Sequence, residues 1–374
     1  MKIGIEAQRI FRTNKHGMDF VALEVIKELQ RIDHENEYFI FVAPGADRCL
    51  EPSNNVHIIE VKCPTYPLWE QIALPLAVAR IKLDILHCTS NTAPIFCSVP
   101  LILTLHDIIF LENQEGSNKS WYQNMGRIYR RIVVPKILKK CKKIITVSNF
   151  ERNNIISKLH LPKHNIVTIH NGYSNRFSVL TDDVSCVTQK YIAESEYLLL
   201  FGNTDPRKNV PRTLKAYSAY LNQSNKKRHL LIIDIDENIL NTIIKDENIE
   251  NIRPYICSYG YIPIEDIAYL YNGAWLFLYT SLREGFGIPI LESMACGTPV
   301  ITGNVSSMPE VAGDGGMLVN TFDANAIANK LLEFESDESL YDIQVDYGFE
   351  RVKQYSWNNT AKALLKVYKE TVNS

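Results

Sequence analysis

The most informative segment of this chain runs from Arg283 to Val300 and reads Arg-Glu-Gly-Phe-Gly-Ile-Pro-Ile-Leu-Glu-Ser-Met-Ala-Cys-Gly-Thr-Pro-Val. Its pattern predicts a glycine loop that leads directly into a helix and then into a strand. Gly285 and Gly287 permit a close approach of the backbone to a ligand, or a positive φ angle. Pro289 suits the first position of a helix, and Gly297 suits the end of that helix. The segment therefore predicts one βα unit of an α/β sheet.

The loop that opens this predicted helix is suited to hold a phosphate group. A helix N-terminus presents backbone N–H groups and the positive end of the helix dipole. Glu292 falls one turn inside the helix, where its carboxylate can accept hydrogen bonds from sugar hydroxyls. Glu284 precedes the loop, and we expect it to face the reacting end of the same ligand.

The bulk composition restricts the class of protein. A chain of 374 residues exceeds one typical core and predicts two domains. The net charge of −2 gives no overall attraction to nucleic acid, so no nucleic-acid partner is expected. The N-terminus lacks the hydrophobic region of a signal peptide, and no apolar stretch approaches the length of a membrane span. The eight scattered cysteines are typical of reduced thiols in a cytoplasmic protein.

Apolar runs and amphipathic stretches alternate along the whole chain, which predicts βα units and parallel sheets. The expected strands are Lys2–Ile5, Tyr38–Val42, Val56–Glu60, Ile85–His87, Leu101–Leu105, Lys143–Val147, Ile166–Ile169, Tyr197–Phe201, Leu230–Ile233, Ile252–Ile256, Trp275–Tyr279, Pro299–Thr302 and Gly316–Val319. The stretch from about Asn175 to Glu194 has no sustained period and is the expected linker. Two doubly wound halves would hold a ligand at the carboxyl ends of their strands.

The Arg283–Val300 segment resembles the signature of the retaining nucleotide-sugar glycosyltransferases of family four, also called group 1. Two glutamates separated by seven residues enclose Glu-Gly-Phe-Gly and are followed by Leu-Glu-Ser-Met-Ala-Cys-Gly-Thr-Pro-Val. The resemblance implies the GT-B fold: α/β, with two Rossmann-like doubly wound domains facing across a cleft. Residues 1–180, with a C-terminal helix at 357–374 crossing back, would form the acceptor-side domain. Residues 195–356 would bind the donor.

A pair of cations marks a second candidate segment. Gly202 ends a predicted strand, and Arg207 and Lys208 precede a predicted helix. A guanidinium fork and a compact ammonium together can neutralise a diphosphate, although a solvated loop carries such a pair just as readily. The family has an Arg-Lys-Asn segment in this place. The resemblance therefore implies that these two cations take part in catalysis.

Two further candidates lie in the first half. His106 follows a predicted strand in Leu105-His106-Asp107, and a lone histidine of this kind is often structural. The matching histidine of the family lies beside the donor sugar, so the resemblance implies a catalytic role. Gly17 stands where the family usually has a glycine-rich loop with two adjacent glycines. Because of this departure, the acceptor side of the site can differ from that of other family members.

The resemblance implies a donor-binding set that complements the catalytic residues Glu284, His106, Arg207 and Lys208. Tyr261 and Ile262 would border the nucleotide base, and Glu292 would bind the ribose hydroxyls. The whole donor-binding set is Gly17, Gly202, Tyr261, Ile262, Gly285, Phe286, Gly287, Ile288 and Glu292. In the family, the acceptor attacks from the face that the phosphate leaves, so no protein nucleophile is required.

No cofactor is expected, since the nucleotide diphosphate sugar is a co-substrate, and no obligatory metal is expected either. Asp234-Ile235-Asp236 matches the Asp-x-Asp step that binds a metal in another glycosyltransferase fold. Here the step ends an apolar strand, and we interpret it as a strand end followed by a helix cap.

A basic stretch from Arg127 to Lys143 contains eight basic residues and no acidic one, with Trp121, Tyr122 and Tyr129 before or among them. It is interpreted either as a solvated helix face, the commoner case, or as a surface that contacts anionic lipid at the inner membrane.

The predicted activity is transfer of a mannose- or glucose-type hexose from a nucleotide diphosphate sugar to the hydroxyl of a saccharide or lipid-linked acceptor, with retained configuration. The resemblance makes surface polysaccharide or lipopolysaccharide biosynthesis in the cytoplasm the expected setting. Two alternatives remain. A nucleotide-sugar epimerase of the same fold would act without an acceptor. A non-catalytic sugar-binding protein would not need the Arg207-Lys208 pair.

Overall fold

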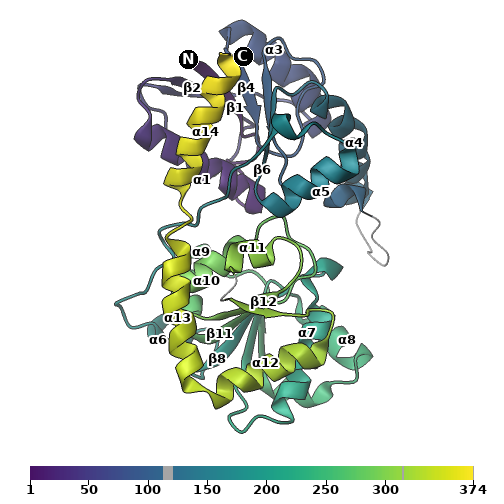
Figure 1. Ribbon diagram of the computed structural model, residues 1–374, viewed down its shortest axis with the longest axis vertical. Helices are drawn as coiled ribbons and strands as arrows, with labels where there is room; N and C mark the ends of the chain where they lie inside the picture. The colour runs from purple at the N-terminus through teal and green to yellow at the C-terminus, as the bar shows by residue number, and fades with distance from the viewer. Residues whose placement is uncertain (113–120, 314–315, 374) are drawn as a thin grey trace. The chain divides into compact units, whose positions relative to one another are not determined.

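The computed structural model describes residues 1–112, 121–313 and 316–373, without the side chains of residues 121–124. Trp121 and Tyr122, which flank the basic stretch, therefore lie outside the described side chains. The chain divides into two compact units, Met1–Gly172 with Ser356–Ser374 and Tyr173–Tyr355. Each unit is built on one parallel sheet (Figure 1).

The first unit holds the parallel sheet β3-β2-β1-β4-β5-β6-β7. Its strands are β1 (Lys2–Glu6), β2 (Glu37–Val42), β3 (Val56–Glu60), β4 (Ile85–Cys88), β5 (Leu101–Thr104), β6 (Lys143–Thr146) and β7 (Ile166–Thr168). Its helices are α1 (Gly17–Ile32), α2 (Tyr66–Leu68), the π-helical turn η1 (Trp69–Ala73), α3 (Leu74–Ile81), α4 (Trp121–Leu138), α5 (Asn149–Leu159) and α14 (Trp357–Val372), with 3-10 turns η2 (Ile109–Leu111) and η3 (Lys163–Asn165).

Side chains that alternate along each strand bury both faces of this sheet. On one face, Leu86 and Leu103 pack with the buried residues of α3, α4 and α5. On the other face, His87 and Thr104 line a small space together with residues of α1 and α14. Burial on both faces explains why these strands are continuous apolar runs.

The last helix returns to the first unit, as predicted (Figure 1). Ser356 caps α14 by accepting a hydrogen bond from the Asn359 N–H at 3.1 Å. Asn358 then donates to Glu28 of α1 at 2.8 Å. A Cβ atom on Gly172 would lie 2.2 Å from the backbone nitrogen of Trp357, so only glycine permits the two chain segments to pass here.

The second unit holds the parallel sheet β10-β9-β8-β11-β12-β13. Its strands are β8 (Tyr197–Phe201), β9 (Leu230–Ile233), β10 (Ile256–Tyr259), β11 (Ala274–Tyr279), β12 (Val300–Gly303) and β13 (Met317–Val319). Its helices are α6 (Ser185–Thr188), α7 (Val210–Leu221), α8 (Glu237–Asp246), α9 (Ile264–Gly273), α10 (Ile288–Ala295), α11 (Met308–Ala312), α12 (Ala324–Ser336) and α13 (Glu338–Val352), with 3-10 turns η4 (Pro206–Lys208) and η5 (Glu250–Tyr255).

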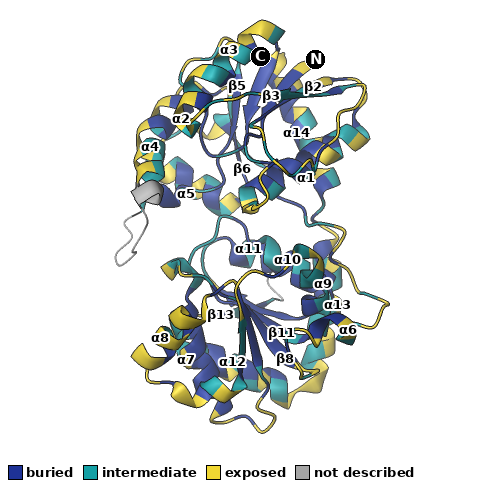
Figure 2. Cartoon of the chain, turned by 180° about the vertical axis from the view of Figure 1, so that it is seen from behind, coloured by how far each residue is buried: buried dark blue, intermediate teal, exposed yellow. Residues whose placement is uncertain are grey.

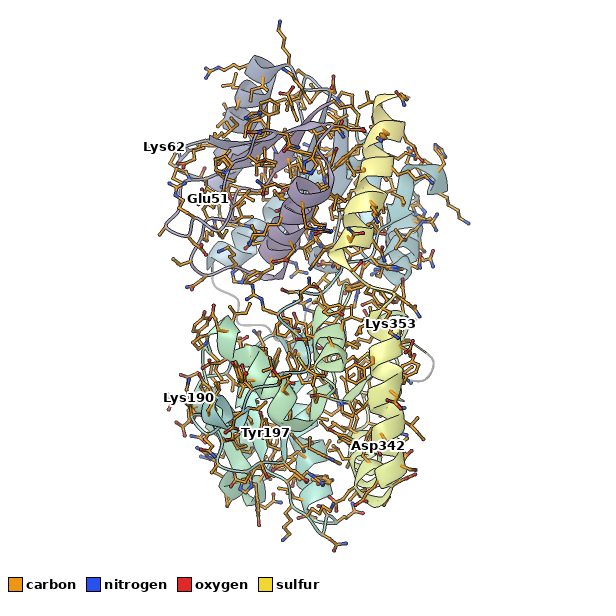
Figure 3. All side chains as sticks on the ribbon, turned by 90° about the vertical axis from the view of Figure 1, so that its left-hand side faces the viewer. Glu51, Lys62, Lys190, Tyr197, Asp342 and Lys353 are labelled. Carbon is orange, nitrogen blue, oxygen red and sulfur yellow. The ribbon has the colours of Figure 1, made fainter. Side chains whose placement is uncertain are left out.

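The core of the second unit is aliphatic and aromatic. Leu198, Leu230 and Leu276 of the central strands pack against α7 and α12. The phenol of buried Tyr197 donates to the Leu270 carbonyl at 2.7 Å. Figure 3 shows Tyr197 within this unit, and charged side chains such as Lys190, Asp342 and Lys353 at its surface.

The predicted α/β class with two Rossmann-like sheets is confirmed. The predicted strand at Ile252–Ile256 is wrong, because Glu250–Tyr255 forms the 3-10 turn η5, which contains Pro254, and the strand is Ile256–Tyr259. Proline cannot donate to the ladder of an interior strand. The N-terminal part of the first unit ends at Gly172, and the segment 175–194, expected as a linker, belongs to the second unit. There the Leu180 N–H donates to the Asn272 side-chain oxygen at 2.9 Å.

Candidate active site

A pair of cations stands at the carboxyl end of β8. Asp205 caps η4 by accepting a hydrogen bond from the Arg207 N–H at 3.1 Å. The Arg207 guanidinium donates back to the same carboxylate through Nε at 3.0 Å and Nη2 at 2.8 Å. The Arg207 and Lys208 side chains are 31% and 30% exposed, so each can reach a ligand. The sequence-predicted cations therefore share one accessible turn.

Glu284, from the loop after β11, lies against this turn. The Lys208 ammonium donates to Glu284 Oε1 at 2.7 Å and lies 5.4 Å from the centre of the Tyr279 ring. Burial disfavours the ionised carboxylate, but the ion pair with Lys208 and a hydrogen bond from Ser281 outweigh it, and the pKa of Glu284 lies below its ordinary value. Glu284 is therefore a carboxylate at neutral pH.

The backbone of the glycine loop is held in one conformation by two serines. Ser306 donates to the Glu284 carbonyl at 2.6 Å, and Ser307 donates to the Phe286 carbonyl at 2.8 Å. Phe286 is buried, so its side chain anchors the loop. A loop fixed in this way can present its backbone to a ligand without first losing conformational freedom.

Gly287 connects the loop to α10 with a φ angle of +109°, which side-chain-bearing residues rarely adopt. Gly297 follows the helix with φ +75°, as a helix-ending glycine does. The helix begins at Ile288, so Pro289 is its second residue. Gly285 is not among the described glycines with positive φ. The predicted glycine loop that opens a helix is present. In the first turn of α10, Pro289 has no N–H, and the Ile290 N–H donates to the Gly287 carbonyl at 3.1 Å.

Glu292 lies one turn into α10, as predicted, and differs electrostatically from Glu284. The Tyr271 phenol donates to Glu292 Oε2 at 3.3 Å. Burial raises the pKa of Glu292 to about 7, against the lowering effects of that hydrogen bond and of the Arg176 charge. The carboxyl of Glu292 can therefore both donate and accept hydrogen bonds near neutral pH.

The remaining predicted donor residues of this unit are Gly202, Tyr261 and Ile262. Tyr261, which follows β10, is 83% exposed, whereas Ile262 is buried. Gly202 follows β8, and a Cβ atom there would meet the Ile235 Cβ at 2.9 Å. Packing within the unit already requires a glycine at this position, so its role toward the donor stays a prediction.

In the first unit, His106 lies at the carboxyl end of β5 and is buried. Its ring Nε2 lies 2.8 Å from the Thr89 carbonyl, and its backbone N–H donates to Asn91 Oδ1 at 2.6 Å. Burial lowers the pKa of His106, against the raising effect of the Thr89 carbonyl. The ring is therefore neutral at pH 7, and Nε2 carries the proton when it donates to that carbonyl. Gly17 begins α1 with open space around its α-carbon.

Asp236 caps α8 by accepting hydrogen bonds from the Asn238 and Ile239 N–H groups at 2.9 and 3.3 Å. The interpretation of Asp234-Ile235-Asp236 as a strand end with a helix cap is thus confirmed. Ser148 caps α5 in the same way by accepting from the Glu151 N–H at 3.1 Å.

Two buried carboxylates of the first unit were missed from the sequence. Glu6 ends β1, and burial raises its pKa to about 7, although the Gln8 N–H donates to it at 3.0 Å. Glu70, in the π-helical turn η1, accepts hydrogen bonds from the phenols of Tyr66 and Tyr129, and burial raises its pKa. Nothing local distinguishes these glutamates from surface ones. Only their tertiary surroundings do.

In the second unit, sequence reasoning missed Arg176 and the exact role of Asn209. The positive charge of Arg176 lowers the pKa of Glu292, and Arg176 lies in the segment that was expected to be a linker. Asn209, in the left-handed conformation, donates to the carbonyls of Thr280 and Thr321 at 3.0 and 2.8 Å. It thereby ties the cation turn to the loop after β11. The Arg-Lys-Asn segment was a signal that could have indicated this tie.

Comparison with known proteins adds to this geometry. Residues 189–351 match the family Glycosyl transferases group 1, and residues 16–175 match Glycosyltransferase Family 4. The O-antigen chain mannosyltransferase B of Escherichia coli is 34% identical over 276 residues, which cover 72% of this chain and 70% of that protein. The serotype-specific mannosyltransferase WbdA of Escherichia coli is 24% identical over 81% of this chain, which spans only 39% of WbdA.

The fold has solved counterparts. The structure of Anabaena HepE in complex with UDP-glucose superposes with a TM-score of 0.75 at 17% identity, covering 99% of this chain and 100% of HepE. Two Rossmann-like units, with a last helix that returns to the first, define a protein of the GT-B architecture. The chain belongs to the group 1, family 4 glycosyltransferases. It is a glycosyltransferase.

Proposed function

We propose that this enzyme transfers a hexose of the mannose or glucose type from a nucleotide diphosphate sugar to a hydroxyl of a saccharide or lipid-linked acceptor. The observation that carries the proposal is the cluster of Arg207, Lys208, Glu284 and Glu292 around the loop that opens α10. A diphosphate needs cations and N–H donors, and a ribose needs a hydrogen-bonding carboxylate. The second unit offers both at one edge of its sheet.

The two cations are proposed to stabilise the leaving nucleotide diphosphate. Each is paired with a carboxylate, Arg207 with Asp205 and Lys208 with Glu284. A bound diphosphate would contact the exposed sides of the Arg207 and Lys208 side chains, while the two carboxylates hold these cations in place. Charge that develops as the glycosidic bond breaks would then meet donors that are already oriented. We further propose that these cations make a divalent metal unnecessary, so that transfer persists in EDTA.

We assign Glu292 to the ribose hydroxyls, and Gly202 and the loop Gly285–Ile288 to the diphosphate. Tyr261 and Ile262 would border the base. Glu284 and the neutral His106 would position the sugar, and Gly17 would approach the donor through its backbone. We propose retention of configuration, with the acceptor proton passing to a phosphate oxygen.

The relatives supply the biological setting of the proposal. They include O-antigen chain and serotype-specific mannosyltransferases, which favours a mannose-type donor and a surface polysaccharide or lipopolysaccharide product. The eight cysteines are all free thiols, which favours a reducing compartment such as the cytoplasm.

The first test is a thermal-shift panel of GDP, UDP, ADP and dTDP with the wild-type protein and Glu292→Gln. A nucleotide at a hundred times its dissociation constant should stabilise the wild type by about 2.7 kcal/mol. Stabilisation by one nucleotide, reduced in the variant, supports the assignment and names the donor class. Absence of any shift, also with the intact nucleotide sugars, would contradict the proposal.

The second test separates transfer from other reactions of the same donor. Incubation of the donor alone should leave the sugar unchanged, whereas a nucleotide-sugar epimerase would convert it. With a saccharide acceptor, NMR of the first product should show the anomeric configuration of the donor. Inversion would contradict the retaining mechanism and leave the donor assignment intact.

A further inference from the structure

One surface of the first unit concentrates its exposed apolar side chains. Eight large hydrophobic residues are exposed in the described part of this unit, and seven of them lie on three adjoining segments. The seven are Leu68, Ile72 and Leu76 on α2–η1–α3, Phe96 in the loop after β4, and Met125, Ile128 and Ile132 on α4. Together with the lysines described below they form what we call the apolar–basic face.

The spacing of these residues places them on single helix faces. Leu68, Ile72 and Leu76 recur every four residues, and Met125, Ile128 and Ile132 recur at intervals of three and four. Their neighbours point inward, because Leu74 and Val78 of α3 and Val133 and Ile137 of α4 belong to the core. Each helix thus buries one side and leaves a second apolar side uncovered by the described residues, which a solvated helix does not need.

Contacts from both helices show that the two stripes adjoin. The Tyr129 phenol of α4 accepts a hydrogen bond from Gln71 Nε2 of η1 at 2.8 Å, and its ring lies 6.0 Å from that of Tyr66. Figure 2 shows α2, α3 and α4 next to one another in this unit, with many exposed residues. A hollow of about 400 Å³ beside α3 is lined by Leu76, Phe96 and Lys140, among others.

The charges around this apolar surface are of one sign. Exposed Lys136, Lys139 and Lys142 have no acidic partner among the described residues, and Lys140 lies over the Phe96 ring at 4.4 Å. Residues 125–143 contain no acidic side chain, and the only one in residues 66–82, Glu70, is buried. Arg127 and Arg131, in contrast, donate to the carbonyl of Phe110, so part of the basic stretch is structural.

We propose that the apolar–basic face rests on the surface of an anionic lipid membrane. The apolar side chains would enter the headgroup region, and the lysines would meet lipid phosphates. The charge selects this occupant over a second copy of the chain, because two copies of one basic face repel each other. None of the helices in the described ranges is long and apolar enough to cross a bilayer, so the contact is peripheral. The proposal does not depend on the transfer reaction.

The test is flotation of the full chain with vesicles of neutral phosphatidylcholine and with vesicles that also contain anionic phosphatidylglycerol. We expect flotation only with the anionic vesicles and a decrease as salt is added, because screening weakens surface attraction. Ile128→Glu should reduce binding at least tenfold. The matched control is Ile343→Glu on α13, since Ile128 and Ile343 are 57% and 58% exposed. The control should bind as the wild type does.

A second pair of variants tests the charge separately. Lys136→Glu with Lys139→Glu should weaken binding by more than tenfold, since each basic residue near an anionic surface contributes a factor of about five. Lys366→Glu with Lys369→Glu, exposed at the same spacing on α14, is the control. Nucleotide thermal shifts of every variant show that it is folded. Failure of that assay in the wild type would count against the proposed function and not against this face.

Two results would overturn the proposal. One is absence of flotation of the wild type with anionic vesicles at low salt, or equal loss in test and control variants. The other is light scattering that shows a dimer which Ile128→Glu dissociates, because the face would then be a protein interface. The proposal is supported if both test variants lose binding to anionic vesicles and both control variants keep it.

Discussion

The carboxyl edges of the two sheets carry opposite electrostatic arrangements. In the second unit, the carboxylate of Glu284 is paired with Lys208, and its pKa lies below the ordinary value. In the first unit, Glu6 is buried and has no ion-pair partner among the described residues, and its pKa is raised to about 7. Burial lowers the pKa of His106, so its ring is neutral at pH 7. The second unit thus carries a compensated ion pair beside the buried carboxyl of Glu292, whose pKa is raised to about 7. In the first unit, burial suppresses the charge of both Glu6 and His106.

This difference has a chemical meaning for a glycosyltransferase. Oriented and compensated ions are suited to a ligand that itself carries charge, such as a diphosphate. Buried neutral acids and a neutral imidazole offer hydrogen bonds without a net field, which suits the hydroxyls of a saccharide. The comparison therefore supports a division of labour, with the second unit for the donor and the first unit for the sugar and acceptor side.

The largest expected effect comes from Lys208→Ala. We expect kcat to fall by about 10²–10³, because the variant removes a cation that we propose stabilises the leaving diphosphate. The unfolding free energy should also fall by about 1–3 kcal/mol, because Glu284 keeps a buried charge without its partner. Steady-state transfer assays and urea unfolding measure the two effects.

A matched pair of variants separates catalysis from stability. Lys208→Met combined with Glu284→Gln should recover much of the lost stability and none of the activity. Lys215→Ala on α7, which removes an exposed ion pair with Glu247, should change kcat little. Full activity in Lys208→Ala would break the proposed contrast between the two edges.

Glu292→Gln has the next largest expected effect. Nucleotide affinity should fall about 10- to 100-fold if the carboxylate binds the ribose, since hydrogen bonds to charged groups contribute about 1.5–3 kcal/mol. Because the pKa of Glu292 is raised to about 7, ionisation costs stability as pH rises through 7. The ligand-free variant should therefore be more stable than the wild type at pH 8, by on the order of 2 kcal/mol, and similar at pH 5. Glu265→Gln, exposed on α9, should alter neither property.

Much of the second-unit site is predictable from sequence because its signals are local. Glycine and proline constrain the few residues around them, so Gly287, Pro289 and Gly297 locate α10 within one residue. Arg207 and Lys208 fall beside the same loop because parallel strands end at one edge.

The rest depends on tertiary neighbours. Arg176 lies near Glu292 only after the chain folds, and no periodicity marked its segment. Glu70 accepts a hydrogen bond from the phenol of Tyr129, which lies 59 residues away in the sequence. The apolar–basic face was detectable as charge in the sequence, but which apolar residues stay exposed is decided by packing.

Glycine substitutions compare the two units at the same kind of position, the start of a helix. Gly287→Ala should lower the unfolding free energy by about 1–3 kcal/mol, because alanine is strained at φ +109°. Gly17→Ala meets nothing within 4 Å and should be neutral or stabilising by up to about 1 kcal/mol. Urea unfolding of both variants measures the difference. If both variants changed the unfolding free energy by the same amount, the positive φ angle of Gly287 would not be the source of its expected sensitivity.

The smallest expected effect is the pH dependence of stability that Glu6 introduces. Its pKa is raised to about 7 in the folded chain, so the folded state holds the proton more tightly than the unfolded state. Stability from this group is complete below the ordinary pKa and is lost as pH rises through 7, by on the order of 2 kcal/mol between pH 5 and 8. Glu284 has the opposite sign, since its lowered pKa makes stability fall only under acidic conditions.

Glu6→Gln tests this contrast, because the amide cannot ionise. The slope of unfolding free energy against pH between 5 and 8 should become flatter than in the wild type, whatever the constant offset from changed hydrogen bonding. Glu51→Gln, at the surface of the same unit (Figure 3), should leave the slope unchanged. An unchanged slope in Glu6→Gln would show that this carboxylate is ionised in the folded chain at neutral pH. The first-unit edge would then be charged, as the second-unit edge is, and the proposed neutral surroundings for the acceptor sugar would have to be abandoned.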